Sequence, residues 1–78
     1  MQTTPVDSAV ISEIGHDPDT NVLEVHFHNG RVYHFFLLPR SEYEALLSAD
    51  SIGAYFNRVI RPSYRSIRID TSTSGLDT

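Results

Sequence analysis

The sequence contains no cysteine and no lysine, and it has no long apolar run. The absence of cysteine excludes disulfides, thiolate nucleophiles and cysteine-based zinc sites. No apolar run approaches the roughly 18 residues that a membrane span needs. Residues 1–8 also lack the basic and apolar regions of a signal peptide. We therefore expect a cytoplasmic protein with no membrane partner and no small-molecule cofactor.

All six basic residues are arginines, and ten acidic residues outnumber them, so the formal net charge is −4. This excess argues against a protein that nucleic acid would hold through bulk charge. The distribution is uneven, however, because residues 51–69 contain no acid. That segment carries four of the six arginines, Arg58, Arg61, Arg65 and Arg68. The chain is therefore acidic in its first half and basic near its end.

The chain has 78 residues, which is enough for one domain. A domain of this size buries only about 60% of its unfolded surface, so a partner or a dimer contact would help its core. The polar ends predict a flexible N-terminus over residues 1–8 and a disordered tail over residues 70–78. The domain itself is expected over residues 9–69.

Three segments in the first half are predicted to be strands. Residues 9–16 are rich in β-branched side chains and precede a turn at residues 17–21, which contains Asp, Pro and Asn. Residues 22–28 alternate apolar and polar side chains, as a half-buried strand does. An Asn-Gly pair follows, which is a strong hairpin signal, and residues 31–38 form the returning strand.

Two short helices are predicted next. Pro39 ends the third strand, and Ser41 and Glu44 have the spacing of a capping box for a helix that reaches about Ala49. Asp50 or Ser51 caps the second helix, which Pro62 should end. Apolar residues mark one face of this helix, namely Ile52, Tyr55, Phe56, Val59 and Ile60.

Residues 64–69 are predicted to be extended and could add an edge strand. The expected fold class is therefore α+β, with a three-stranded antiparallel β-meander followed by two short α-helices and, if residues 64–69 pair, an extra C-terminal edge strand.

The register of the predicted hairpin decides which side chains face outward. A two-residue turn would place Tyr33 and Phe35 on the outer face as a platform for stacking bases. A three-residue loop with Gly30 in a bulge would instead pair Val25 with Tyr33 and turn both aromatic side chains toward the core. We favour the bulged register because it avoids burying His34, which would cost about 1–3 kcal/mol without a partner.

The sequence resembles the KTSC domain over roughly residues 8–69. The motifs that carry the resemblance are Gly15-His16-Asp17, Leu23-x-Val25-x-Phe27, Gly30 to Phe35, Pro39, Tyr43, Leu46-Leu47, Ser51 to Asn57, Ile60-Arg61 and Tyr64. This module is named for the C-terminus of some lysyl-tRNA synthetases, and it also occurs alone in small bacterial and phage proteins. The resemblance implies a small α+β module, and its synthetase context suggests RNA binding by analogy.

Two residues depart from the family pattern. The family is marked by a central Tyr-x-Tyr, whereas this chain has Tyr33-His34-Phe35, so the second hydroxyl is missing. The family's usual tyrosine in the first turn is His16 here.

The late arginines are the leading functional candidates, because a planar guanidinium group suits phosphate. Tyr64, Tyr33 and Phe35 could stack on bases. Solubility and placement near a helix C-terminus are the simpler interpretation of the arginines.

Two weaker candidates are an anion site and a metal site. Ser51 and Gly53 open the second helix, where backbone N–H groups could hold an anion, although a helix cap explains them equally well. His26, His28 and His34, with Glu24 nearby, could suit zinc, but half-exposed strands often carry histidine, and we predict no metal. No catalytic motif is present, so we expect no enzyme.

Two hypotheses about function remain open. The first is a nucleic-acid-binding module for RNA or tRNA, based on the arginines and the aromatic hairpin. The second is a protein-interaction module or homodimer, based on the overall acidity, the surplus apolar residues 36–38 and open strand edges.

Overall fold

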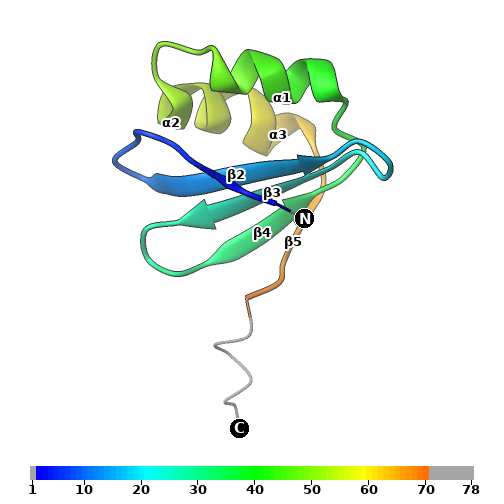
Figure 1. Ribbon diagram of the computed structural model, residues 1–78, viewed down its shortest axis with the longest axis horizontal. Coiled ribbons are helices and arrows are strands. Elements are labelled where there is room, and N and C mark those ends of the chain that lie inside the picture. Colours follow the sequence, from blue (N-terminus) through cyan, green and yellow to red (C-terminus); the bar gives the residue numbers. More distant parts are fainter. Residues whose placement is uncertain (1, 71–78) are drawn as a thin grey trace, which may run out of the picture.

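The computed structural model describes residues 2–70, in which five antiparallel strands form one sheet in chain order. They are β1 (Thr4–Pro5), β2 (Ile11–Asp17), β3 (Val22–Phe27), β4 (Val32–Phe35) and β5 (Ser66–Arg68). The helices all cover the same face of this sheet, as Figure 1 shows. The α+β class is confirmed, and the sheet has two more strands than the predicted meander. One of them, β5, is the edge strand that residues 64–69 could supply.

Strand β1 lies within residues 1–8, where the sequence predicts flexibility and no strand. It pairs with β2, with Thr4 opposite Ile14. Gly15 explains the close approach, because a Cβ atom at this position would lie 2.3 Å from the carbonyl oxygen of Gln2. Gly15 lies inside β2 and is buried. Gly15 therefore marks the point where a neighbouring backbone approaches the strand closely.

The hairpin between β3 and β4 has the bulged register that the sequence favours. Val25 lies opposite Tyr33, and Leu23 lies opposite Phe35. The N–H of Phe27 donates to the carbonyl of Arg31 at 2.9 Å, which closes a three-residue loop. Gly30 in this loop has a φ of +91°, a left-handed conformation that favours glycine. The Tyr33 and Phe35 side chains therefore point toward the helices and not toward the outer face.

Helix α1 spans Arg40–Leu47, and it begins differently from the prediction. Pro39 occupies the N-cap position, and the expected capping box does not form. The Glu44 carboxylate instead accepts a hydrogen bond from Nε of Arg40 at 3.0 Å, one helical turn away. No helix within residues 2–70 is long and apolar enough to cross a membrane.

The second predicted helix is one helical stretch with a wide turn in its middle. It comprises α2 (Ile52–Tyr55), the π-helical segment η1 (Phe56–Ile60) and α3 (Arg61–Ser63). Ser51 caps it as predicted, because its hydroxyl oxygen accepts the N–H of Ala54 at 3.2 Å. The predicted end at Pro62 is wrong, since the helix continues through this residue. The π-turn accounts for this, because a wider turn accommodates a ring that would clash with the carbonyl four residues earlier in an α-helix.

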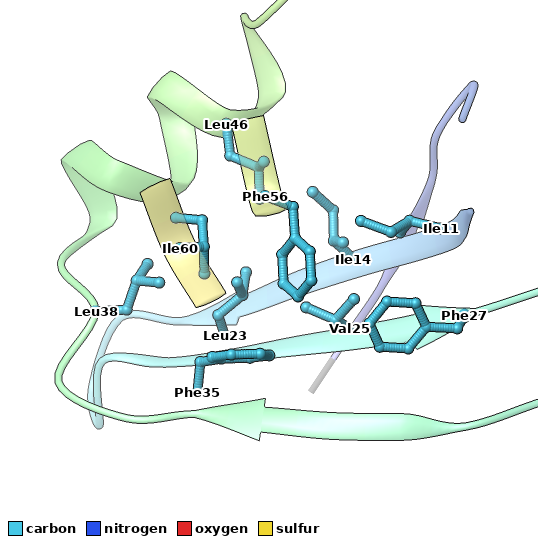
Figure 2. Close-up of a cluster of buried hydrophobic side chains, with 10 residues drawn as sticks. All are labelled: Ile11, Ile14, Leu23, Val25, Phe27, Phe35, Leu38, Leu46, Phe56 and Ile60. Atoms are coloured by element: carbon cyan, nitrogen blue, oxygen red, sulfur yellow. The ribbon is translucent and has the colours of Figure 1, made fainter. Parts of the chain in front are cut away.

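The core lies between the sheet and the helices (Figure 2). Its ten buried members are Ile11, Ile14, Leu23, Val25, Phe27, Phe35, Leu38, Leu46, Phe56 and Ile60. The Phe56 ring points from η1 toward the sheet. It makes edge contacts with Phe27 at 5.6 Å and with Phe35 at 5.2 Å between ring centroids. Phe56 therefore joins the helical layer to strands β3 and β4.

The outer face of the sheet carries a small polar cluster centred on Glu24. Its carboxylate accepts hydrogen bonds from Nε2 of His26 at 2.5 Å and Nε2 of His34 at 2.7 Å. His28 lies apart from them, with its Nε2 bonded to the carbonyl of Ser8. Within residues 2–70, no three histidine or acidic side chains form a group that could hold a metal ion. Of the three histidines that the sequence grouped, two therefore share the Glu24 carboxylate and the third lies apart.

Replacing Phe56 by alanine should strongly destabilise the fold. Removal of a buried phenylalanine typically lowers the free energy of unfolding by about 3–5 kcal/mol, and small domains have only about 5–15 kcal/mol in total. Urea denaturation followed by circular dichroism would measure the loss. The matched control is Asn57→Ala at the next, exposed position, which should stay within about 0.5 kcal/mol of the wild type. Equal stability of both variants would contradict the assigned core.

Glu24 should make the stability of the fold sensitive to acid. Burial acts to raise the pKa of Glu24, but the hydrogen bonds from His26 and His34 outweigh it and lower the pKa below the ordinary value of 4.5. Because the folded pKa is lower than the unfolded pKa, the ionised carboxylate stabilises the fold at pH values above the unfolded pKa. This contribution is lost as the pH falls through the folded pKa.

Glu24→Gln should therefore flatten the acid side of the stability profile. Urea midpoints measured between about pH 6 and pH 3 would show a smaller decrease for this variant than for the wild type. Glu44→Gln is the matched control, because Glu44 pairs with Arg40 at an exposed site where water screens the charges. Identical acid profiles for the two variants would refute the role of Glu24.

Candidate nucleic-acid interface

A hollow of about 340 Å³ opens beside β4 and β5, on the face of the sheet that the helices cover. Its floor is aromatic, and two arginines and a serine complete its wall. The lining residues are Phe27, Arg31, Tyr33, Phe35, Arg61 and Ser66. We call this the aromatic hollow. It brings together three predicted site residues, Tyr33, Phe35 and Arg61, from segments far apart in the sequence.

Tyr33 is neither a surface platform nor a fully buried core residue. Its ring makes an edge contact with Phe27 at 5.8 Å and a tilted contact with Phe35 at 6.4 Å between centroids. Phe35 is only 3% exposed, whereas Tyr33 is half-buried at the margin of the core. The bulged register thus places the Tyr33 ring in the wall of the hollow, where part of it remains accessible.

Arg61 is positioned by the π-turn that precedes it. The N–H of Arg61 donates to the carbonyl of Phe56, five residues earlier. The Arg61 guanidinium group lies 5.2 Å from the centre of the Phe56 ring, a cation–π contact. The same aromatic ring therefore fills the core and orients a cation at the hollow.

Arg31 is a lining residue that the sequence analysis did not select. It stands alone in the first half of the chain, outside the acid-free segment. Its position just after Gly30 was the available signal, because the bulged loop brings Arg31 opposite Phe27 at the loop end of the hairpin. Phe27 and Ser66 also join the hollow without having been predicted as site residues.

The other late arginines are exposed but are not part of the hollow. Arg68 on β5 donates to the Asp70 carboxylate at 2.5 and 3.1 Å, and this partner raises the pKa of Arg68. Arg58 lies on η1, and Arg65 precedes β5. Among residues 2–70, Arg31, Arg58, Arg61 and Arg65 form no ion pair. Four guanidinium groups are therefore free to meet an anion.

Tyr64 has a structural contact that competes with its predicted role in stacking. Its hydroxyl donates to the Glu42 carboxylate at 3.0 Å, and the Tyr55 hydroxyl donates to the same group. Burial and Glu42 raise the pKa of Tyr64, while hydrogen bonding to Glu42 raises the pKa of Tyr55. These bonds tie α1 to the second helical stretch and so fix the arginines that follow.

Ser51 and Gly53 line a different hollow at the start of α2. The hydroxyl oxygen of Ser51 is already bonded to the N–H of Ala54. Asp7 and Asp50 line the same hollow, and their charges would repel an anion. The geometry therefore supports the cap interpretation of Ser51 over the anion site.

His16, which stands where the family usually has tyrosine, packs inside the fold. Its Nε2 donates to the carbonyl of Leu38 at 2.7 Å, and its ring stacks on Tyr43 at 5.3 Å. The imidazole therefore links β2 to the segment that leads into α1, and it lies outside the aromatic hollow.

Several known proteins are similar to this chain. An uncharacterised protein of Stutzerimonas stutzeri is 39% identical over 71 residues, which are 90% of this chain and 100% of the relative. A lysine–tRNA ligase of Nostoc punctiforme is 32% identical over 59 residues, which are 76% of this chain but only 10% of the enzyme. This chain therefore spans about a tenth of that ligase.

A solved structure agrees with the fold described above. The crystal structure of a KTSC domain protein from Yersinia pestis has a TM-score of 0.82 and 35% identity. The similarity covers 87% of this chain and 96% of the other. The KTSC domain family matches residues 7–64. The resemblance seen in the sequence motifs is thus confirmed, and the chain belongs to the KTSC domain family.

Proposed function

We propose that this domain is a non-enzymatic module that binds single-stranded RNA through its late arginines and its aromatic hollow. The observation that carries the proposal is the set of four exposed guanidinium groups that have no acidic partner among residues 2–70, two of which line a hollow with an aromatic floor. Single-stranded nucleic acids are commonly bound by this combination, because cations follow the phosphates while aromatic rings stack on bases.

The local charge supports this proposal despite the net charge of −4. Residues 51–69 contain four arginines and no acid, so η1, α3 and β5 contribute only basic charges, although Asp70 pairs with Arg68 beside β5. The similar segment in a lysine–tRNA ligase provides a context in which an RNA-binding appendage would be useful. Because four arginines can neutralise only a few phosphates, binding should be weak and strongly dependent on salt.

The triple variant Arg58→Ala, Arg61→Ala and Arg65→Ala should lose most RNA binding. Fluorescence anisotropy with labelled single-stranded RNA and with tRNA would measure affinity from low to moderate salt. Loss of three phosphate contacts should reduce the slope of log affinity against log salt by about 2, and the affinity at low salt by about tenfold or more.

Arg40→Ala is the matched control for this experiment. Arg40 is also exposed, but it pairs with Glu44 on α1 and does not line the aromatic hollow. RNA binding should therefore be unchanged in this variant. Equal loss in both proteins would show that binding follows total charge, and no binding of the wild type at low salt would refute the proposal.

A protein-interaction or homodimerisation function is the second candidate. It is supported by exposed apolar side chains, Leu37 at 82% and Ile67 at 54%, the latter on the edge strand β5. Leu37 also has a φ of +57°, a left-handed conformation that is strained for leucine. An open edge strand can pair with a strand of another chain.

This second candidate predicts a concentration-dependent dimer that Ile67→Lys disrupts. Light scattering over micromolar to millimolar concentrations would detect it. Leu47→Lys changes an apolar residue that is 39% exposed on α1, away from the edge, and should leave the dimer intact. A strict monomer throughout this range would exclude the homodimer.

A further inference from the structure

We propose that the aromatic hollow is a binding site for one unstacked nucleobase together with its phosphate. This inference rests on the proposed function for the identity of the polymer, but the hollow by itself should also bind a free mononucleotide. Its volume of about 340 Å³ lies at the lower end of the range of small-molecule sites. A single nucleotide therefore suits this volume better than a larger ligand does.

The aromatic lining provides the contact for the base. Phe27 and Phe35 are almost fully buried, so they form the floor, while the half-buried Tyr33 offers an accessible part of its ring. The contacts of Tyr33 with Phe27 and Phe35 restrict its side chain before any ligand binds. A preorganised ring loses little entropy on stacking, which favours a base over a flexible apolar group.

The charges around the hollow select an anionic ligand. Arg31 and Arg61 line it, and no acidic side chain does. Arg61 is oriented by its contact with the Phe56 ring, so its guanidinium group is held near the hollow. A phosphate attached to the ribose could therefore meet a cation while the base lies on the aromatic floor. A neutral aromatic molecule would leave both arginines without a partner.

The backbone of Ser66 could bind the polar edge of the base. The N–H of Phe36 donates to the carbonyl of Arg65, and the N–H of Ile69 donates to the carbonyl of Val32. Because hydrogen bonding alternates along an antiparallel strand, the N–H and C=O of Ser66 point away from β4. Ser66 lines the hollow and lies on the edge strand, so a donor, an acceptor and a hydroxyl group are present there.

Nuclear magnetic resonance titration would test this site with two ligands that differ only in the base. Adenosine 5′-monophosphate should shift the amide signals of the residues that line the aromatic hollow. Ribose 5-phosphate carries the same phosphate without a base, and it should bind at least about tenfold more weakly, because stacking provides much of the affinity. Equal affinity for the two ligands, or shifts confined to other residues, would overturn the inference.

Tyr33 variants would then locate the base. Tyr33→Leu should reduce the affinity for adenosine monophosphate to that of ribose phosphate, whereas Tyr33→Phe should retain it because the ring remains. The amide spectrum and urea midpoint of each variant would show that it folds. Arg31→Ala, at an exposed position, provides a second test of mononucleotide binding. Unchanged mononucleotide affinity in folded Tyr33→Leu would reject the site.

The double variant Arg58→Ala and Arg65→Ala separates this inference from the proposed function. Neither residue lines the aromatic hollow. The double variant should therefore bind the mononucleotide normally but bind RNA more weakly. Mononucleotide binding without any RNA binding would refute only the RNA function. RNA binding that does not depend on Tyr33 would refute only the base site.

Discussion

The packing of the Phe56 ring is the interaction on which both the fold and the candidate site depend. This one side chain contacts Phe27 and Phe35 on the sheet and the guanidinium group of Arg61 on α3. The aromatic floor of the hollow and the cation at its edge are therefore positioned by the same buried group. In a domain of 78 residues, such sharing is expected, because the core is too small to separate structural and binding residues completely.

The hollow exists because the helical layer covers the sheet unevenly. Strands β2, β3 and β4 contribute buried side chains to the core, whereas all three residues of β5 are exposed. The helices thus cover β2, β3 and β4 on one face of the sheet, and they leave the edge at β5 exposed. Arg61 lies on α3 and Arg68 on β5, so the basic part of the sequence lies next to this exposed edge of the sheet.

The sequence predicted those features that follow from local chemistry. Period-two alternation identified β3, and Asn29-Gly30 with its bulge identified the correct register. Strand β1 could not be predicted, because its two residues are held by pairing with β2 and not by their own propensity. The wide turn at η1 was also missed, since its five residues have the spacing of an ordinary helix and only tertiary packing distinguishes the two.

Only part of the candidate site could be predicted, because local patterns do not show which distant residues meet in the fold. Composition pointed to the late arginines, and the hairpin register pointed to Tyr33 and Phe35. Only the tertiary structure brings Arg31 into the same hollow as Tyr33 and Phe35. For an isolated arginine such as Arg31, the position after a hairpin loop is the one local signal, and it does not show which distant residues the side chain will meet. Tyr64 is a residue that the sequence selected for stacking on bases. In the structure its hydroxyl instead donates a hydrogen bond to Glu42 on α1.

The π-helical segment makes the type of helical turn, as well as residue identity, a determinant of this surface. A π-turn contains one residue more than the α-helical turn it replaces. A regular α-helix with the same sequence would turn by about 100° per residue and would place Arg61 about 140° around the helix axis from Phe56. Arg61 would then leave the Phe56 ring without any change in its own identity. The extra residue of the wide turn therefore sets the direction of the basic surface as much as the residue types do.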